Sequence, residues 1–197
     1  MEFRVESAVD KDILSQAAKF HFEGLSYRSF LTLFGQEFLE LIYKTLLQDH
    51  LGFFVLAMEG DRLFGFVFGC LDSRKLSRIM IEKMHIFLPI VIKVLVKRPG
   101  LIKNIFETIF YSSREGSDIR SELLVMVVAE GRRSQGVGTE LVGKFEKALI
   151  QRGHREYKVT VHQEMARANH FYQKNNMHSL KEFMLYGHKW NVYAKNL

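Results

Sequence analysis

A buried strand that runs straight into a glycine-bearing helix start is the feature that most constrains the fold of this chain. Residues 122–128 form a nearly unbroken run of Leu, Val and Met after an initial glutamate, which is typical of a strand buried on both faces. Residues 134–151 then carry apolar side chains three and four positions apart, which predicts an amphipathic helix, and Gly153 follows as its expected left-handed stop. A strand followed directly by a helix favours an architecture that mixes sheet and helix.

The junction between these two elements, Ala129 to Thr139, has the chemistry of an anion site. Gly136 and Gly138 let backbone N–H groups approach an anion closely, and the helix N-terminus adds a partial positive charge. Arg132 and Arg133 supply charge-assisted hydrogen bonds. Neither G-x-G-x-x-G nor G-x-x-x-x-G-K-[ST] occurs in this stretch, so the expected ligand is a diphosphate held in some other way.

The other periodic segments supply strands and helices on both sides of this junction. The patterns predict, in chain order, a strand over residues 2–8, a helix that begins after Asp10, a helix over about 26–48, strands over 52–58 and 62–71 joined by a turn at Gly60, a strand over 157–161, a helix over 165–175, and two short strands about Gly187 within 179–193. No Pro/Gly/Ser-rich linker or internal repeat divides the chain, so residues 1–197 are expected to form a single domain.

The segment of residues 73–118 is too long to be a simple connection between two strands. Its apolar residues recur at helical spacing and Pro99-Gly100 interrupts the pattern, which predicts an insert of two helices, the first kinked by Pro89. The longest uncharged run, Met84 to Ile92, has nine residues, far fewer than the roughly 20 that span a bilayer. A lid, a contact in a homodimer and a helix that lies on a membrane surface all fit this pattern.

The motif at the junction resembles that of one known family. Arg133-Ser134-Gln135-Gly136-Val137-Gly138 matches R-x-x-G-x-G/A, the motif of the GNAT superfamily of acyl-coenzyme A-dependent N-acyltransferases, and it lies between a strand and an amphipathic helix as in that family. The resemblance covers about residues 121–186, and the order of the preceding elements resembles the family's N-terminal half. It implies an α/β (α+β) fold with a mixed, mainly antiparallel sheet of about seven strands flanked by helices, and with a helical insert between strands three and four.

The resemblance also implies a donor, acetyl-coenzyme A (acetyl-CoA), which would lie where the fourth and fifth strands splay apart. By register with the family, the backbone of Met126, Val127 and Val128 would hold the pantetheine and the thioester. The diphosphate would be held, mostly through main-chain groups, by Arg133, Ser134, Gln135, Gly136, Val137, Gly138 and Thr139. The alternative is that the two glycines only permit close packing of the helix on the strand.

Acylation of an amine needs a group that accepts a proton, because a free alkylamine, like lysine, has a pKa of roughly 10. Glu122 precedes the R-x-x-G-x-G motif at the same spacing as the glutamate that serves as base in some GNAT members, and burial would raise its pKa. The alternative for Glu122 is a solvated carboxylate at a strand end. His162, after the next strand, is a second candidate base, although a lone histidine there is more often structural or exposed.

Tyr172 is the candidate acid that protonates the leaving thiolate of coenzyme A. Residues 165–177 resemble the family's N-x-x-A-x-x-F-Y-x-x-x-G-F helix, with Ala168, Phe171 and Tyr172 in register, and tyrosine is the family's usual acid at that position. The alternative for Tyr172 is a ring that packs in the core with its hydroxyl at the edge.

This helix departs from the family pattern at three positions. Met165 replaces the cofactor-contacting asparagine, Asn176 replaces the glycine and Met177 replaces the phenylalanine. Asparagine adopts the left-handed conformation that a helix stop needs, but methionine cannot make the hydrogen bonds of an amide. We expect Asn169, one turn further along the helix, to supply the missing cofactor contact.

Composition and charge limit the other functions of the chain. Cys70 is the only cysteine, which excludes an internal disulfide and favours a reducing compartment, with the cytoplasm as the default. The N-terminal residues alternate between apolar and charged, unlike a cleavable signal segment. The histidines lack the spacing of metal ligands, so no metal is expected. Most of the net charge of +6 comes from residues 72–115, where nine Lys/Arg stand against four Asp/Glu.

Together these features predict an N-acetyltransferase that transfers the acetyl group of acetyl-CoA to a primary amine by direct attack in a ternary complex. Cys70 lies in an apolar run with no paired histidine, which argues against a covalent acyl-enzyme. The acceptor is expected to be a small molecule or a peptide, and Arg74, Lys75 and Arg78 of the insert would suit an anionic one. The alternatives are a non-catalytic acyl-CoA sensor and a basic nucleic-acid-binding module, although no motif supports contact with nucleic acid.

Overall fold

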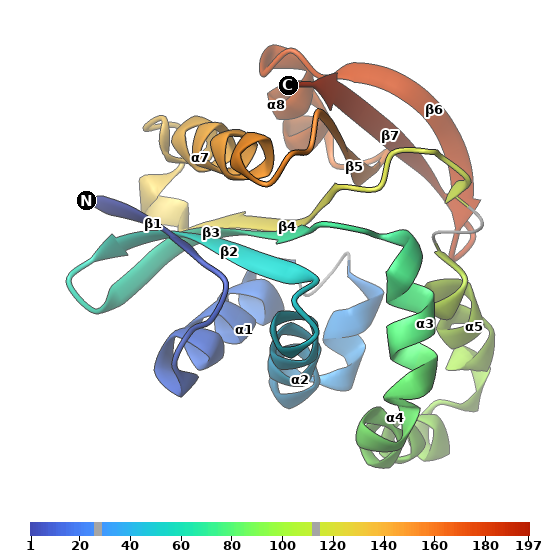
Figure 1. Ribbon diagram of the computed structural model, residues 1–197. Helices are drawn as coiled ribbons and strands as arrows, with labels where there is room; N and C mark the ends of the chain where they lie inside the picture. Colours follow the sequence, from blue (N-terminus) through green and yellow to red (C-terminus); the bar gives the residue numbers. More distant parts are fainter. Residues whose placement is uncertain (26–28, 112–114) are drawn as a thin grey trace. The chain divides into compact units, whose positions relative to one another are not determined.

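The computed structural model spans residues 1–197 and describes all of them except 26–28 and 112–114 (Figure 1). The described residues form seven strands, mostly antiparallel, with helices between them in the sequence. Between the third and fourth strands in the sequence, the described residues form three α-helices. The predicted fold class, a mainly antiparallel sheet with flanking helices and a helical insert, is therefore confirmed.

The chain divides into two compact units. The first unit comprises residues 1–71 and 123–155, and the second comprises residues 72–122 and 156–197. Each unit thus joins two segments that are far apart in the sequence. The expectation of a single domain over the whole chain stays a prediction.

The first unit contains four strands in the order β1-β2-β3-β4. The strands are β1 (Glu2–Glu6), β2 (Gly52–Glu59), β3 (Arg62–Cys70) and β4 (Glu122–Val128), whose first residue belongs to the second unit. The helices are α1 (Lys11–Leu25), η1 (Phe30–Phe34), α2 (Gln36–Gln48), η3 (Glu130–Arg132) and α7 (Val137–Gln151). Antiparallel pairs join β1 to β2 and β2 to β3, which confirms the predicted hairpin.

Helices cover both faces of this sheet, with α1 and α2 on one face and α7 on the other (Figure 1). Successive strand residues point to opposite faces. Accordingly, Phe53 stacks on Phe145 of α7 with ring centroids 5.4 Å apart, whereas Phe54 packs on Tyr43 of α2 at 5.2 Å. At Gly69 an added Cβ would lie 2.3 Å from Cε2 of Phe145, so only glycine allows α7 to approach β3 this closely.

The sequence patterns predicted the start of α1 correctly but not the extent of the helix that follows it. The predicted cap of α1 is confirmed, because Ile13 N–H donates to Asp10 Oδ1 at 2.8 Å. The single helix expected over residues 26–48 is wrong within the described residues, since Gly35, with φ of 89°, separates η1 from α2. Residues 26–28 of that prediction lie outside the described part of the chain.

The second unit contains three antiparallel strands in the order β5-β7-β6. The strands are β5 (Glu156–His162), β6 (His178–Leu185) and β7 (His188–Asn196). The helices are α3 (Arg74–Glu82), α4 (Met84–Lys97), η2 (Pro99–Leu101), α5 (Ile102–Ile109) and α8 (Ala166–Lys174). Asn176, with φ of 62°, follows α8 in the left-handed conformation predicted for it.

The described residues of the insert form three α-helices, α3, α4 and α5, where two were expected. The first predicted helix is divided at Lys83, which caps both α3 and α4, and Pro89 lies inside α4 rather than at a break. The described residues contain no helix long and apolar enough to cross a membrane.

Candidate functional site

The junction between β4 and α7 has the backbone of an anion site. Gly136 is the N-cap of α7 with φ of 82° and ψ of −9°, a left-handed conformation that favours glycine, and Ser134 also has a positive φ of 62°. Helix α7 begins at Val137, three residues later than predicted, so residues 134–136 form the turn before it. The first N–H groups of a helix have no acceptor within the helix, and they face an anion placed at this end.

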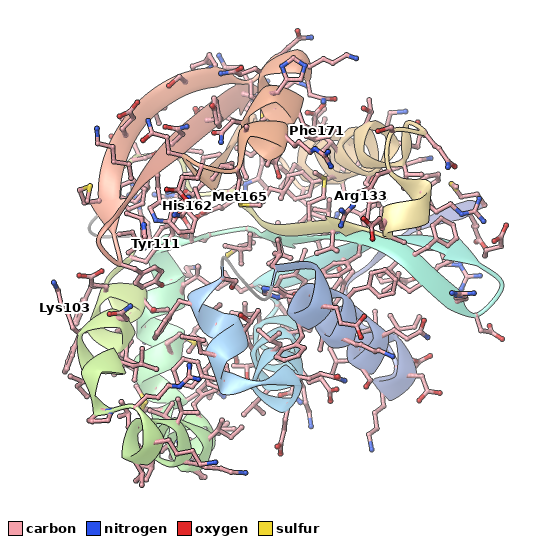
Figure 2. The ribbon with its side chains drawn as sticks, turned by 180° about the vertical axis from the view of Figure 1, so that it is seen from behind. Lys103, Tyr111, Arg133, His162, Met165 and Phe171 are labelled. Atoms are coloured by element: carbon pink, nitrogen blue, oxygen red, sulfur yellow. The ribbon has the colours of Figure 1, made fainter. Side chains whose placement is uncertain are left out.

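The two arginines of the junction are held differently. Arg133 donates from Nε to the backbone oxygen of Val128 at 3.0 Å, so its side chain folds back over the end of β4 (Figure 2). Arg132 pairs with Glu59 at 2.9 Å and lies over the ring of Phe64 at 5.3 Å, which ties η3 to the β2–β3 hairpin. Both side chains stabilise the turn, and both leave positive charge at an exposed surface.

Two glycines position β4 in the first unit. A Cβ added at Gly24 of α1 would lie 2.8 Å from Cγ1 of Val127, and one added at Gly65 of β3 would lie 3.3 Å from the backbone oxygen of Val127. Beyond β4, Ala129 N–H still donates to the oxygen of Phe64 at 2.8 Å. The strand that is expected to carry the pantetheine is therefore held by close packing up to the junction.

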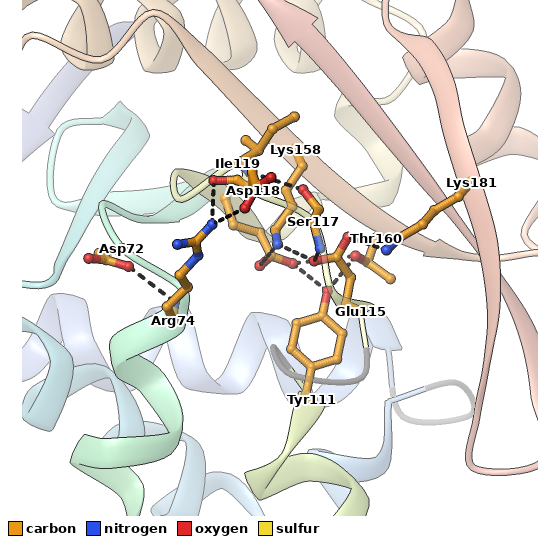
Figure 3. A network of polar contacts seen from close by, with 11 residues as sticks. Asp72, Arg74, Tyr111, Glu115, Ser117, Asp118, Ile119, Lys158, Thr160 and Lys181 are labelled. Carbon is orange, nitrogen blue, oxygen red and sulfur yellow. Dashed lines mark hydrogen bonds and ion pairs between the residues drawn. The ribbon is translucent and has the colours of Figure 1, made fainter.

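In the second unit, Glu122 lies in a buried polar cluster with Tyr111 and Thr160. Figure 3 shows Tyr111, Thr160 and the ion-paired side chains beside them. The side chain of Glu122 is 2% exposed, and Tyr111 donates its hydroxyl hydrogen to Oε1 of Glu122 at 2.6 Å. The hydroxyl of Thr160 on β5 lies 3.4 Å from the same oxygen and also contacts the hydroxyl of Tyr111. The alternative for Glu122, a solvated carboxylate at a strand end, is wrong, since Glu122 is buried and hydrogen-bonded.

Buried ion pairs complete this cluster. Lys158 of β5 pairs with Glu115, and both side chains are almost completely buried. The Lys158 ammonium also lies 4.0 Å from Oε2 of Glu122, an oxygen that accepts no hydrogen bond from the described residues. Lys181 of β6 reaches Glu115 at 3.6 Å from a partly exposed position. Two carboxylates and two ammonium groups thus balance one another.

Burial is the main reason why the pKa values of Glu122 and Tyr111 are both raised. Burial raises the pKa of Glu122, and the nearby Lys158 charge and the Tyr111 hydrogen bond offset only part of that effect. Burial and the charge of Glu122 raise the pKa of Tyr111 well above its ordinary value. Tyr111 therefore stays protonated as a donor, while Glu122 becomes a stronger proton acceptor than an exposed carboxylate.

The side-chain amide of Asn169 makes hydrogen bonds to other residues of the second unit. Its Nδ2 donates to the backbone oxygens of His162, Gln163 and Met165 at 3.0, 3.2 and 2.9 Å. Its Oδ1 accepts from Asn191 at 2.7 Å and from the Tyr193 hydroxyl at 3.0 Å. These bonds close the turn between β5 and α8 and fasten it to β7.

His162 and Met165 lie at this turn (Figure 2), and Tyr172 lies on α8, the helix that follows it. His162 accepts at Nδ1 from Glu164 N–H at 3.2 Å and packs its ring 5.1 Å from that of Trp190. Met165 is the N-cap of α8, where its side chain offers no cap hydrogen bond. Tyr172 is 5% exposed, and burial raises its pKa.

The structure adds four residues that the sequence did not single out: Tyr111, Glu115, Lys158 and Thr160. One signal for them was present, because Lys158, Thr160 and His162 occupy alternate positions of β5 and therefore one face of it. A lysine that a strand buries between apolar side chains, here those of Tyr157 and Val159, requires a buried counter-charge. No comparable local pattern marks Tyr111 or Glu115.

The three cations of the insert that were expected to meet an anionic acceptor are each paired with an acid. Arg74 pairs with Asp118 at 2.6 Å, Lys75 with Asp72 at 3.9 Å and Arg78 with Glu82 at 2.7 Å. Their contact with an acceptor stays a prediction. Among the described residues, no three His, Cys, Asp or Glu side chains form a group that could hold a metal ion.

Comparison with known proteins adds evidence from outside the chain. Residues 20–177 match the family described as "Acetyltransferase (GNAT) family". No curated protein matches the sequence. Similar solved structures include an aminoglycoside 6'-N-acetyltransferase complexed with coenzyme A, with a TM-score of 0.63 and 14% identity over 100% of this chain and 97% of that one.

Two further structures are similar along their whole length. The PaiA N-acetyltransferase of Thermoplasma acidophilum in complex with coenzyme A has a TM-score of 0.62 and 14% identity, and 100% of each chain is covered. An acetyltransferase of Thermus thermophilus has a TM-score of 0.59 and 14% identity over 100% of this chain and 98% of that one. At these identities the likeness concerns the fold.

Proposed function

Because the chain belongs to the GNAT acetyltransferase family, we propose that it transfers the acetyl group of acetyl-CoA to a primary amine of a small-molecule or peptide acceptor by direct attack. The observation that carries this proposal is the state of Glu122. Its carboxyl group is buried, has a raised pKa and keeps one oxygen free of hydrogen bonds from the described residues. Those are the properties of a general base for an amine.

The junction before α7 fits the diphosphate of acetyl-CoA. Two residues with positive φ, an exposed helix start and two arginines present donors and positive charge at one turn. We assign the diphosphate to residues 133–139 and the pantetheine and thioester to the backbone of Met126, Val127 and Val128, by register with the family motif. The coenzyme A bound to two of the similar structures supports this assignment.

The proposed reaction transfers one acetyl group and one proton. The neutral amine nitrogen attacks the thioester carbonyl carbon, and Glu122 accepts the proton that the nitrogen loses. The carbon–sulfur bond then breaks, and the Tyr172 hydroxyl gives its proton to the thiolate of coenzyme A. Glu122 afterwards releases its proton to solvent and Tyr172 takes one up from solvent, which restores both side chains. The products are an amide and free coenzyme A. His162 remains the second candidate for the base.

Asn169 enters this proposal as a residue that shapes the coenzyme site. Its five hydrogen bonds fix the turn at which Met165 stands in place of the family's asparagine. We propose that Asn169 supports coenzyme binding through the shape of this turn. We also propose a cytoplasmic location, since the one cysteine, Cys70, is a buried thiol in β3.

Calorimetric titration with acetyl-CoA tests the donor site first. Gly136→Glu should weaken binding more than tenfold, because it places a carboxylate where the diphosphate is expected. The matched control is Gly153→Glu at the other end of α7, since Gly153 has the same φ of 82° and equally open space beside its Cα. Equal losses in the two variants, or no binding to the folded wild type, would overturn the donor site.

Turnover is tested separately with a panel of amines. Glu122→Gln should lower kcat about 100-fold or more and leave the affinity for acetyl-CoA unchanged, if Glu122 is the base. Binding of acetyl-CoA without turnover of any amine would favour the sensor instead. Binding to nucleic acid that falls steeply with salt would favour the basic nucleic-acid-binding module.

A further inference from the structure

The insert carries more than half of the exposed large apolar side chains of the described residues. Fifteen large apolar side chains of the described residues are exposed, and eight of them lie between residues 81 and 110. These eight are Ile81, Ile86, Leu88, Ile92, Val96, Ile102, Phe106 and Phe110. Val96 is 79% exposed and is the most exposed of all fifteen. Exposed apolar surface gathered in one segment marks an interaction site more often than scattered single residues do.

Helical spacing arranges these side chains as two stripes. Leu88, Ile92 and Val96 are four residues apart on α4, and therefore lie on one side of it. Ile102 and Phe106 repeat the spacing on α5, and Phe110 continues it, because Phe110 N–H donates to the oxygen of Phe106 at 3.0 Å. Other sides of the two helices are already packed, since Phe87 and Val91 of α4 and Ile109 of α5 are buried. Folding of the insert therefore does not require the two stripes to be covered.

Basic residues accompany both stripes. Lys93 and Lys97 follow Ile92 and Val96 directly and are exposed, and Lys103 lies on the outward side of α5 (Figure 2). From Met84 to Ile109 the only acidic side chain is that of Glu107, which is buried. Lys93, Lys97 and Lys103 form no ion pair with the described residues.

We propose that α4 and α5 dock on the surface of an anionic lipid bilayer, with the two apolar stripes in contact with the acyl-chain boundary and the lysines at the lipid headgroups. Apolar stripes edged with lysine are the chemistry of helices that lie in the plane of a membrane surface. The core of a protein–protein interface is depleted of lysine, so a second copy of the chain fits this surface less well. Neither α4 nor α5 is long enough to cross a membrane, which leaves contact with one face.

Co-sedimentation of the whole chain with vesicles tests this proposal without any need for turnover. Vesicles of phosphatidylcholine with about one third phosphatidylserine should bind the protein at least tenfold more tightly than vesicles of phosphatidylcholine alone, and added salt should weaken that binding. The double variant Lys93→Glu/Lys97→Glu should lose most of it. Equal binding to both kinds of vesicle would overturn the proposal.

The apolar part is tested by Val96→Glu and Phe106→Glu, which should each lower binding about tenfold or more. The matched control is Ile150→Glu, because Ile150 of α7 is 54% exposed and lies outside the insert. All three positions are more than half exposed, so the variants should melt at the temperature of the wild type. An equal loss with Ile150→Glu would overturn the proposal. The proposal would also be overturned if the wild type did not bind vesicles but formed a dimer, measured by light scattering, and Val96→Glu disrupted that dimer.

Discussion

Tyr111, just past α5, donates a hydrogen bond of 2.6 Å to Glu122 at the start of β4. The helical insert thereby contributes a side chain to the carboxylate that is proposed as the base. Tyr111 does not need to touch the substrate to matter. It fixes the direction of the Glu122 carboxylate and stabilises its charged form, which makes it a positioning residue.

Removing that hydroxyl should change the ionisation of Glu122. The hydrogen bond from Tyr111 lowers the pKa of Glu122, so Tyr111→Phe should raise that pKa further. NMR of ¹³C-glutamate-labelled protein measures this pKa, and the Glu122 carboxyl resonance is identified as the one that is missing in Glu122→Gln. In Tyr111→Phe this resonance should titrate at higher pH than in the wild type. The pH at which kcat/KM falls on the acid side should also rise. Below that pH, kcat/KM of Tyr111→Phe should be about tenfold lower than that of the wild type. An unchanged titration would mean that the bond does not act on Glu122.

Lys158 should contribute far more to stability than Lys181, although both pair with Glu115. Lys158→Met leaves buried carboxylates without their counter-charge, which should cost about 3–5 kcal/mol of unfolding free energy. Lys181 is 34% exposed, so Lys181→Met should cost less than about 1 kcal/mol. Urea unfolding at pH 7 measures both.

A double variant separates charge from packing at this site. Lys158→Met/Glu115→Gln removes the unpaired charge together with the lysine, and it should recover part of the lost stability. Equal losses in Lys158→Met and Lys181→Met would contradict the buried ion pair as the main contribution.

The strands and the junction were predictable because their signals are local. The run at 122–128 and the turn at Gly60 depend on neighbouring residues, and β4, β2 and β3 were found within two residues of their ends. The helix predicted over residues 26–48 was too long. Apolar residues recur at helical spacing on both sides of Gly35, so the pattern did not indicate that the helix is interrupted there. A glycine at a positive φ is recognisable only when the conformation is known.

The surroundings of Glu122 were not predictable, because they depend on contacts between distant parts of the chain. Tyr111, Glu122 and Thr160 come from a helical insert and two strands, and the two hydroxyls lie 49 positions apart in the sequence. Family register found Glu122 without showing that it is buried. Whether a carboxylate at the end of a strand is solvated or enclosed is decided by packing, which a single sequence does not record.

Asn169→Ala should affect the β5–α8 turn before it affects any bound ligand. The variant removes the side-chain donor to three backbone oxygens and the acceptor for the side chains of Asn191 and Tyr193. The oxygens of His162 and Met165 keep a backbone N–H donor. We expect a loss of about 2–3 kcal/mol in unfolding free energy. We also expect weaker binding of acetyl-CoA, measured by calorimetry at a temperature where the variant is folded. Full stability with unchanged affinity would show that the bonds of Asn169 are dispensable.

His21 should make the stability of the protein depend on pH. Its ring is buried in α1, with Nδ1 2.7 Å from the hydroxyl of Tyr43, and burial lowers the pKa of His21 from 6.5 to about 4. His21 is therefore protonated near pH 6.5 in the unfolded chain but only near pH 4 in the folded chain. The free energy of unfolding is therefore not reduced by His21 above pH 6.5, where the ring is neutral in both states. It falls as the pH drops from 6.5 to about 4, because protonation of His21 favours the unfolded chain.

His21→Gln removes the titrating ring and should flatten that dependence. Urea unfolding at pH 7, 5.5 and 4 should show the wild type losing up to about 3 kcal/mol more than the variant, since each pKa unit corresponds to about 1.4 kcal/mol. His85→Gln, at an exposed position of α4, controls for the loss of an imidazole and should follow the wild type. If His21→Gln and the wild type lose stability in parallel, the folded protein protonates His21 as readily as the unfolded chain does, and its burial has no electrostatic cost.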